Sequence, residues 1–167
     1  MSNNVIFLDI DGVLNSDSFF KAKEGSPEMH PDAPNYHENI ALEMFDPKAI
    51  SLLNTIVEKT QAVIVISSSW RLAFTLDDLR FILNKAGLIA DIFDKTDFKF
   101  SSTRYNEINW WLRDHKDIDS FIILDDLEAS WFYSLQPYVV QTTWAHGLLP
   151  EHVDLAITLM NRSEKWL

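Results

Sequence analysis

Short apolar runs alternate along the chain with segments whose apolar residues recur at helical spacing. Five of these runs are short enough to be strands, and each is followed by polar residues or a turn. The predicted strands cover residues 5–8, 62–66, 88–93, 121–124 and 138–141. Strands that alternate with helices are typical of a parallel sheet covered by helices on both faces. We therefore predict a Rossmann-like, doubly wound α/β fold of about five strands in three layers.

The helices between these strands carry start and stop signals. Asp46 and Pro47 are typical of a helix start, because aspartate accepts a hydrogen bond from a free backbone N–H group and proline has a preset φ angle. Thr75, followed three residues later by Asp78, resembles a capping box, and Gly87 suits the left-handed end of the same helix. Two further helices are predicted over residues 105–114 and from residue 150 onward.

Residues 15–45 interrupt the alternation. This segment contains three prolines and two histidines but little periodicity, and it follows the first strand directly. Ligands of open parallel sheets bind at the carboxyl ends of the strands, and long loops in compact domains are commonly functional. We predict an irregular insertion or minor cap here, with a tolerated surface loop as the alternative, inside a single domain that spans residues 1–167.

Two aspartates, Asp9 and Asp11, follow the first strand. Because side chains alternate along an extended backbone, both carboxylates project to the same side if the chain stays extended there. Two ionised carboxylates at close range need a cation or a shared proton. The pair therefore indicates a site for a divalent metal ion, although aspartate and glycine are also ordinary turn residues.

Asp125 and Asp126 follow another fully apolar strand, which places them at the same carboxyl edge of the sheet. Together with the first pair they offer enough oxygens for a Mg²⁺ ion that is otherwise bound by water. One of the two can instead cap a helix that begins at Leu127. Ser67 and Ser68 end the second strand at this edge, where their hydroxyl groups can donate to a phosphate oxygen or form a turn.

In this order the motifs resemble those of the haloacid-dehalogenase-like (HAD) phosphatase superfamily. The matching segments are Asp9-Ile10-Asp11-Gly12-Val13, a strand that ends in Ser67, a basic residue ahead of a helix, and Ile122-Ile123-Leu124-Asp125-Asp126. The resemblance covers nearly the whole chain. An aspartate two positions after the nucleophile is found in HAD phosphatases and phosphomutases, whereas the dehalogenases lack it and the ion pumps have threonine. The resemblance therefore implies phosphoryl transfer to water.

The resemblance also implies a role for each matching residue. Asp9 is expected to be the nucleophile that becomes an aspartyl-phosphate, and Asp11 the general acid and base, a function typically worth ~10²- to 10⁴-fold in rate. The residues expected to contact the substrate phosphate are Gly12, Ser67, Ser68, Arg71 and Lys95. Those expected to hold Mg²⁺ are Asp9, Asp11, Asp125 and Asp126.

The third motif needs a basic residue, most often lysine in this superfamily. Lys95, Lys99 and Arg104 all lie between the third strand and the following helix. Arg104 is preferred because it stands at the helix start, where an unpaired cation opposes the helix dipole and helix stability does not explain it. Lys95, directly after the strand, is the second choice. The alternative for each residue is a solvated surface charge.

A narrower resemblance concerns the segments 66–71 and 104–112. They are similar to a HAD subgroup named for multi-enzyme Swiss Army Knife RNA-repair proteins. By this resemblance Trp70 and Arg71 stand at the rim of the site, where arginine can pair with a phosphate and tryptophan can stack on a base. A buried Trp70 with Arg71 on the surface is the alternative.

The amino-acid composition and the net charge limit the classes of function that the chain can have. The 167 residues are 47% apolar, enough for one sizeable core, and the net charge of −11 repels nucleic-acid backbones at long range. The absence of cysteine excludes disulfides and thiolate metal sites. The N-terminal residues resemble neither a signal peptide nor a membrane span, so we expect a cytoplasmic protein without a membrane partner.

Together these observations predict a Mg²⁺-dependent phosphomonoester hydrolase that acts through Asp9 on a phosphorylated small molecule or a nucleic-acid end. A nucleotide or RNA-end phosphatase is the alternative with the same chemistry, and the net charge disfavours it. A non-catalytic phosphate- or protein-binding module on a HAD scaffold is the alternative of another class. The presence of both Asp9 and Asp11 argues against such a module. The sequence does not specify the oligomeric state.

Overall fold

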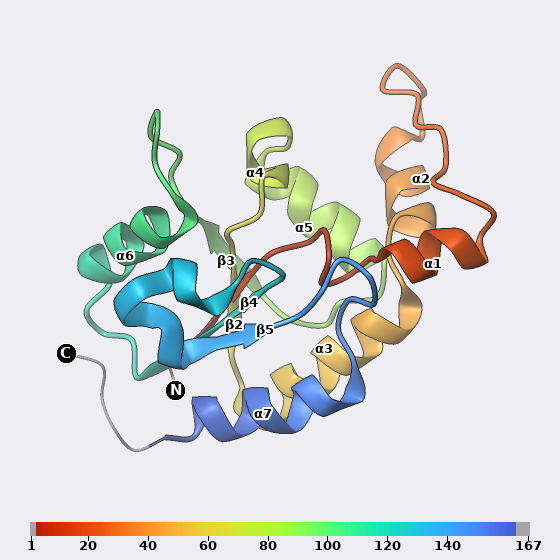
Figure 1. The fold of residues 1–167 in the computed structure, drawn as a ribbon. Helices are drawn as coiled ribbons and strands as arrows, with labels where there is room; N and C mark the ends of the chain where they lie inside the picture. The colour runs from red at the N-terminus through yellow and green to blue at the C-terminus, as the bar shows by residue number, and fades with distance from the viewer. Residues whose placement is uncertain (1–2, 163–167) are drawn as a thin grey trace.

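The computed structural model describes residues 3–162 and arranges them around a five-stranded parallel sheet (Figure 1). The strands are β1 (Asn4–Leu8), β2 (Val63–Ile66), β3 (Ile92–Lys95), β4 (Ser120–Asp125) and β5 (Val139–Gln141). Their order in the sheet is β3-β2-β1-β4-β5, so the chain starts in the centre, winds to one edge and then continues to the other. This arrangement confirms the predicted Rossmann-like α/β fold.

Helices connect the strands. They are α1 (Asp17–Ala22), α2 (Tyr36–Glu43), α3 (Pro47–Thr60), α4 (Trp70–Ala73), α5 (Leu76–Lys85), α6 (Arg104–Asp114), the 3₁₀ helix η1 (Ala129–Tyr138) and α7 (Pro150–Met160). Of these, α3, α5, α6 and α7 begin at or within one residue of the predicted positions, whereas α1, α2, α4 and η1 were not predicted. Asp46 caps α3 by accepting a hydrogen bond from the backbone N–H of Lys48 at 2.9 Å. Thr75 and Asp78 form the predicted capping box of α5. Within residues 3–162, no helix is both long and apolar enough to cross a membrane.

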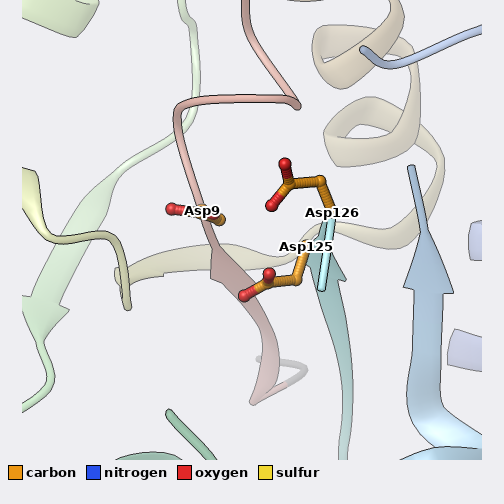
Figure 2. Close-up of side chains that lie close together, drawn as sticks. All are labelled: Asp9, Asp125 and Asp126. Atoms are coloured by element: carbon orange, nitrogen blue, oxygen red, sulfur yellow. The ribbon is translucent and has the colours of Figure 1, made fainter. Parts of the chain in front are cut away.

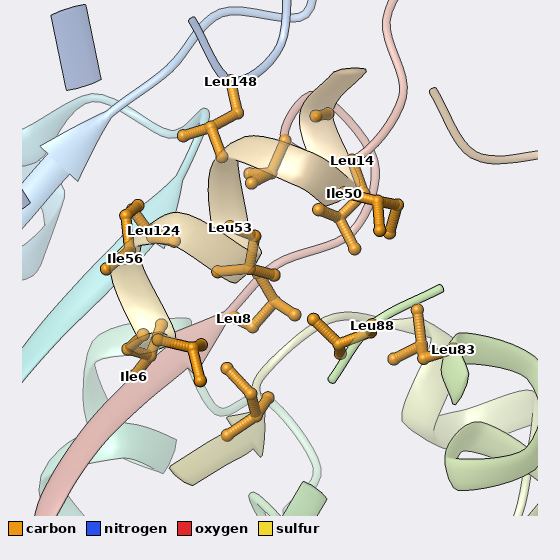
Figure 3. Close-up of a cluster of buried hydrophobic side chains, with 14 of the residues drawn as sticks. Ile6, Leu8, Leu14, Ile50, Leu53, Ile56, Leu83, Leu88, Leu124 and Leu148 are labelled. Atoms are coloured by element: carbon orange, nitrogen blue, oxygen red, sulfur yellow. The ribbon is translucent and has the colours of Figure 1, made fainter. Parts of the chain in front are cut away.

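The central strand β1 shows why helices cover both faces of the sheet. All four of its apolar side chains are fully buried, and they alternate between two cores. Ile6 and Leu8 pack with apolar residues of α3, α5 and α7 (Figure 3). Val5 and Phe7 face the other side, where α6 and η1 cover them. The sheet is therefore held from both faces, which fixes the carboxyl ends of its strands.

The third strand is displaced from its predicted position. We expected a strand over residues 88–93, whereas β3 covers Ile92–Lys95. Leu88 is buried, but it precedes the strand. Because β3 lies at an edge of the sheet, polar residues such as Asp94 and Lys95 are tolerated in it, and the apolar run at residues 88–90 instead forms the connection before the strand, with Leu88 buried and Ile89 exposed.

The segment 15–45 contains α1 and α2, where we expected irregular structure. The Ser16 hydroxyl caps α1 by accepting a hydrogen bond from the N–H of Phe19 at 3.1 Å. The two helices have only six and eight residues, too short for a clear periodicity, and the prolines lie between them. The N–H of Asp46 donates to the carbonyl of Leu14 at 2.8 Å and closes the base of the segment. In Figure 1 α2 lies beside α5, at one end of the sheet.

Candidate active site

Three aspartates converge at the carboxyl edge of the two central strands (Figure 2). Asp9 follows β1, and Asp125 and Asp126 lie at the end of β4. One carboxylate oxygen of each lies within 4.8 Å of the others. We call these three residues the acidic cluster.

The acidic cluster concentrates negative charge in a buried place. Asp125 is fully buried and Asp9 is 6% exposed. Burial raises the pKa of Asp125 to about 7, against the opposing charge of Arg104. Burial and the neighbouring charge of Asp9 also raise the pKa of Asp126. A bound cation would relieve this crowding, and an all-oxygen donor set fits a hard divalent ion such as Mg²⁺.

Backbone hydrogen bonds hold the cluster in place. The N–H of Asp9 donates to the carbonyl of Leu124 at 2.9 Å and extends the β1–β4 pairing by one residue. Asp125 Oδ1 accepts a hydrogen bond from the N–H of Leu127 at 3.0 Å. Asp125 thus caps a turn at Leu127, where the alternative interpretation placed the start of a helix, whereas the first helix after β4 is η1 and begins at Ala129.

Gly12 allows the turn after Asp9 to close on the cluster. Its φ angle is +78°, which glycine adopts readily, and an added Cβ would lie 2.3 Å from Oδ2 of Asp126. The Gly12 N–H donates to Asn15 Oδ1 at 3.1 Å, and its carbonyl accepts from the hydroxyl of Thr142 at 2.6 Å. The predicted contact of Gly12 with a phosphate stays a prediction.

Arg104 brings a positive charge to the acidic cluster. It is the first residue of α6, and its Nη1 lies 3.4 Å from Asp9 Oδ1 and 2.6 Å from Asp125 Oδ2. Although burial acts in the opposite direction, the charges of Asp9 and Asp125 raise the pKa of Arg104. The guanidinium is therefore a permanent cation beside the predicted nucleophile, which is the position expected for the third-motif residue.

The two lysines occupy other places. The Lys95 ammonium donates to the carbonyls of Arg71 and Phe74 at 2.9 and 3.0 Å. Lys99 lies over the ring of Trp110, 4.3 Å from its centroid. Lys95 is thus directed to the backbone of α4 and its end, and its contact with the substrate phosphate stays a prediction.

Two hydroxyl groups near the site lack a partner. Ser67, which follows β2, is fully buried, and its Oγ has no hydrogen-bond partner within residues 3–162. The same holds for Oγ1 of Thr96, which follows β3. Ser68 is also buried, and its Oγ accepts from the N–H of Trp70 at 3.3 Å. Buried polar groups are normally paired, so the free Ser67 hydroxyl is available to a ligand.

Arg71 is buried, which corrects the predicted position at the rim of the site. Its guanidinium donates to the carbonyls of Ser67 and Ser68, to the carbonyl of Thr96, and to the carboxylate of Glu107. Burial lowers the pKa of Arg71, and the charge of Glu107 opposes this effect. Arg71 therefore ties the ends of β2 and β3 to α6.

Three side chains that shape the site were not predicted from the sequence, namely Glu107, Asn15 and Thr142. Glu107 is 4% exposed and precedes Ile108 on the buried side of α6. An acidic residue within an apolar helix stripe was the available signal, because such a residue needs a buried partner. Nothing in the local sequence marked the other two.

Asp11 lies outside the acidic cluster. Its Oδ2 accepts a hydrogen bond from the indole Nε1 of Trp70, and its Oδ1 accepts from Asn15 Nδ2, both at 2.9 Å. The carboxylate is thus engaged by two N–H groups and does not belong to the cluster of Asp9, Asp125 and Asp126, and its role as a metal ligand stays a prediction. Trp70 is half-buried, and its only ring N–H is taken up by Asp11.

The site combines a buried acidic cluster that could hold a metal ion, a guanidinium, an unpartnered hydroxyl and a separate carboxylate. This set suits nucleophilic attack on an anionic group followed by proton transfer. Comparison with known proteins gave one finding that bears on this chemistry. The sequence model of a family described as HAD domain in Swiss Army Knife RNA repair proteins matches residues 5–153. No curated protein and no solved structure gives a significant match.

Proposed function

We propose that this chain, which belongs to the family of HAD domains in Swiss Army Knife RNA repair proteins, is a Mg²⁺-dependent phosphomonoester hydrolase. Membership of the family indicates HAD-type phosphohydrolase chemistry in general. The observation that carries the finer proposal is the buried acidic cluster with Arg104 against two of its members. The carboxylates of such a cluster repel one another, and a bound divalent cation offsets this repulsion and attracts the phosphate.

The proposed reaction has two steps, both centred on Asp9. In the first, a carboxylate oxygen of Asp9 forms a bond to phosphorus as the ester P–O bond breaks, and the leaving oxygen takes a proton from Asp11. In the second, Asp11 removes a proton from water, the water oxygen attacks phosphorus, and the acyl phosphate bond breaks. Inorganic phosphate leaves and both aspartates return to their starting forms.

The surrounding residues stabilise the charge that this reaction brings together. Arg104 neutralises part of the negative charge on Asp9 and can pair with a phosphate oxygen. The unpartnered Ser67 hydroxyl donates to another phosphate oxygen. The acidic cluster binds Mg²⁺, which when bound supplies positive charge against the repulsion between the Asp9 carboxylate and the phosphate.

The substrate is proposed to be a phosphorylated small molecule. A nucleic-acid end is the second candidate, because the family description refers to RNA repair. The net charge of −11 weighs against a long polyanion, since like charges slow association and weaken binding. Turnover of mononucleotides and phosphorylated metabolites, compared with that of oligomers phosphorylated at the 3′ or 5′ end, separates the two candidates.

The decisive experiment measures hydrolysis of p-nitrophenyl phosphate by the wild type and by Asp9→Asn, with Mg²⁺ and with EDTA. The amide has nearly the shape of the carboxylate but is a poor nucleophile, so we expect a folded protein without turnover. Asp154→Asn, at an exposed position on α7, is the matched control and should retain full activity.

Two results would refute the proposal. Activity of Asp9→Asn equal to that of the wild type would remove Asp9 as the nucleophile, and equal activity with and without EDTA would remove the metal. If no phosphorylated compound in a broad panel is turned over by the wild type, the chain is a binding module on a HAD scaffold. Beryllium fluoride with Mg²⁺ should form a stable complex with the wild type and none with Asp9→Asn.

A further inference from the structure

Asp11 is held by two neutral N–H donors that come from distant parts of the chain. Asn15 lies four residues downstream and Trp70 lies 59 residues away. Each donates to a different carboxylate oxygen, and both distances are 2.9 Å. Together the two hydrogen bonds fix the orientation of the Asp11 carboxylate, because a carboxylate held by a single donor can still rotate.

The orientation of both donors is determined by their surroundings. Asn15 is 1% exposed, and its Oδ1 accepts from the N–H of Gly12, so that its Nδ2 is the atom that faces Asp11. The Trp70 ring packs against the rings of Phe45 and Phe74, with centroids 5.4 and 5.6 Å apart. An indole N–H can only donate, so its contact with Asp11 requires an acceptor oxygen.

Both ends of the 15–45 segment take part in this arrangement. Asn15 is its first residue and contacts Asp11 directly, and Phe45 is its last residue and contacts the Trp70 ring. Phe45 is buried, and the hydrogen bond between Leu14 and Asp46 joins the two ends. The base of the insertion therefore determines where the Asp11 carboxylate lies.

We propose that Trp70 and Asn15 are positioning residues that hold Asp11 away from the acidic cluster and thereby keep it available for proton transfer. A carboxylate bound to a metal ion is a weak base and a poor proton carrier. Of the four aspartates at this edge, Asp11 is the one outside the acidic cluster, and each of its carboxylate oxygens accepts from a neutral side-chain N–H group, whereas Asp125 is held by a backbone N–H and the Arg104 guanidinium. This inference rests on the proposed function, because it concerns the group that protonates the leaving oxygen.

The dependence of rate on the leaving group tests this proposal. Phenolate is a strong base and needs a proton as it leaves, whereas p-nitrophenolate is a weak base and leaves without one. The first step, from free enzyme to the covalent intermediate, determines kcat/KM. General acid catalysis contributes ~10²- to 10⁴-fold, so we expect Trp70→Phe to lower kcat/KM about tenfold or more for phenyl phosphate and less than about threefold for p-nitrophenyl phosphate.

Two further variants complete the experiment. Asn15→Asp keeps the shape and the acceptor for the Gly12 N–H but replaces the donor by an oxygen, so it should give the same selective loss even if Trp70→Phe does not fold. Trp144→Phe changes a tryptophan that is 47% exposed and should leave both rates unchanged. Thermal unfolding of each variant separates a positioning effect from a loss of folded protein.

The outcomes distinguish this inference from the proposed function. A steeper dependence on leaving-group basicity in Trp70→Phe and Asn15→Asp, absent in Trp144→Phe, supports the positioning role. Equal losses for both substrates, or the wild-type dependence in both variants, overturn it while the phosphatase activity stands. Absence of any Asp9-dependent turnover in the wild type overturns the proposed function instead.

Discussion

Replacing Arg71 by alanine removes one half of a buried ion pair. The side chains of Arg71 and Glu107 are 5% and 4% exposed. The guanidinium also donates to three backbone carbonyls at the ends of β2 and β3, at 2.7 to 3.1 Å. The other carboxylate oxygen of Glu107 accepts a hydrogen bond from Ser102 at 2.6 Å. The pair thus connects two strand ends to the helix that carries Arg104.

The burial of this ion pair determines how much unfolding free energy Arg71→Ala is expected to lose. Arg71→Ala leaves the Glu107 carboxylate buried with a hydroxyl as its remaining partner, and breaking such a pair typically costs about 3 to 5 kcal/mol in the free energy of unfolding. Burial lowers the pKa of Arg71, and the charge of Glu107 opposes this effect. Taking both charges of such a pair out of water carries a desolvation cost that opposes their attraction. Removing both charges, in Arg71→Met with Glu107→Leu, should therefore cost much less than the sum of the two single changes.

Urea unfolding followed by tryptophan fluorescence measures these free energies for the wild type, Arg71→Ala, Arg71→Met, Glu107→Leu and the Arg71→Met/Glu107→Leu double variant, whose loss is compared with the sum for Arg71→Met and Glu107→Leu. The slope of the transition must stay constant for the comparison to hold. A loss below about 1 kcal/mol in Arg71→Ala, the level of an exposed pair, would refute the argument from burial. Additive losses in the double variant would refute the coupling between the two side chains.

Three other predictions follow from the site and the helix ends. Gly12→Ala places a Cβ against Asp126, so calorimetric titration should show Mg²⁺ affinity reduced about tenfold or more, and unchanged affinity would contradict the crowding. Arg104→Ala loses a charge-assisted contact worth about 1.5 to 3 kcal/mol and should lower kcat/KM at least about tenfold, whereas Lys99→Ala should leave kcat/KM unchanged. A loss of kcat/KM in Lys99→Ala and none in Arg104→Ala would assign the third motif to Lys99. Burial lowers the pKa of His152, whose Nδ1 accepts the N–H that precedes α7, so its contribution to the free energy of unfolding is complete above pH 6.5 and is lost as the pH falls below that value. Unfolding of His152→Gln should lack this acid-sensitive part, and an identical pH dependence would refute the assignment.

Much of the fold could be predicted because its signals are local. Asp46 and Thr75 cap helices through atoms two or three residues away, so the sequence alone contains both partners. The fully apolar runs became central strands because both faces of the sheet are covered. The strand β3 contains no such run, because it lies at the edge of the sheet and has a neighbouring strand on one side only. Its position was therefore the hardest to predict.

The candidate site was predictable where it depends on strand ends. Parallel strands bring their carboxyl ends to one edge, which the sequence predicted, and Asp9, Asp125 and Asp126 meet there because β1 and β4 are neighbours in the sheet. Arg71 was misplaced because its burial depends on Glu107, a residue of another helix. A charged residue next to a serine run has the same local pattern whether it faces a phosphate or a buried carboxylate.

The position of Asp11 shows which property of an active site lies beyond local pattern. Their spacing in the sequence places Asp9 and Asp11 at the same edge of the sheet, but it does not indicate which of the two binds the metal ion. The difference arises from Trp70, which reaches Asp11 only because β1 and β2 are neighbours in the sheet. A nucleophile and a proton carrier of the same residue type are thus distinguished by their neighbours, and substitutions of those neighbours reveal the roles more selectively than substitution of either aspartate.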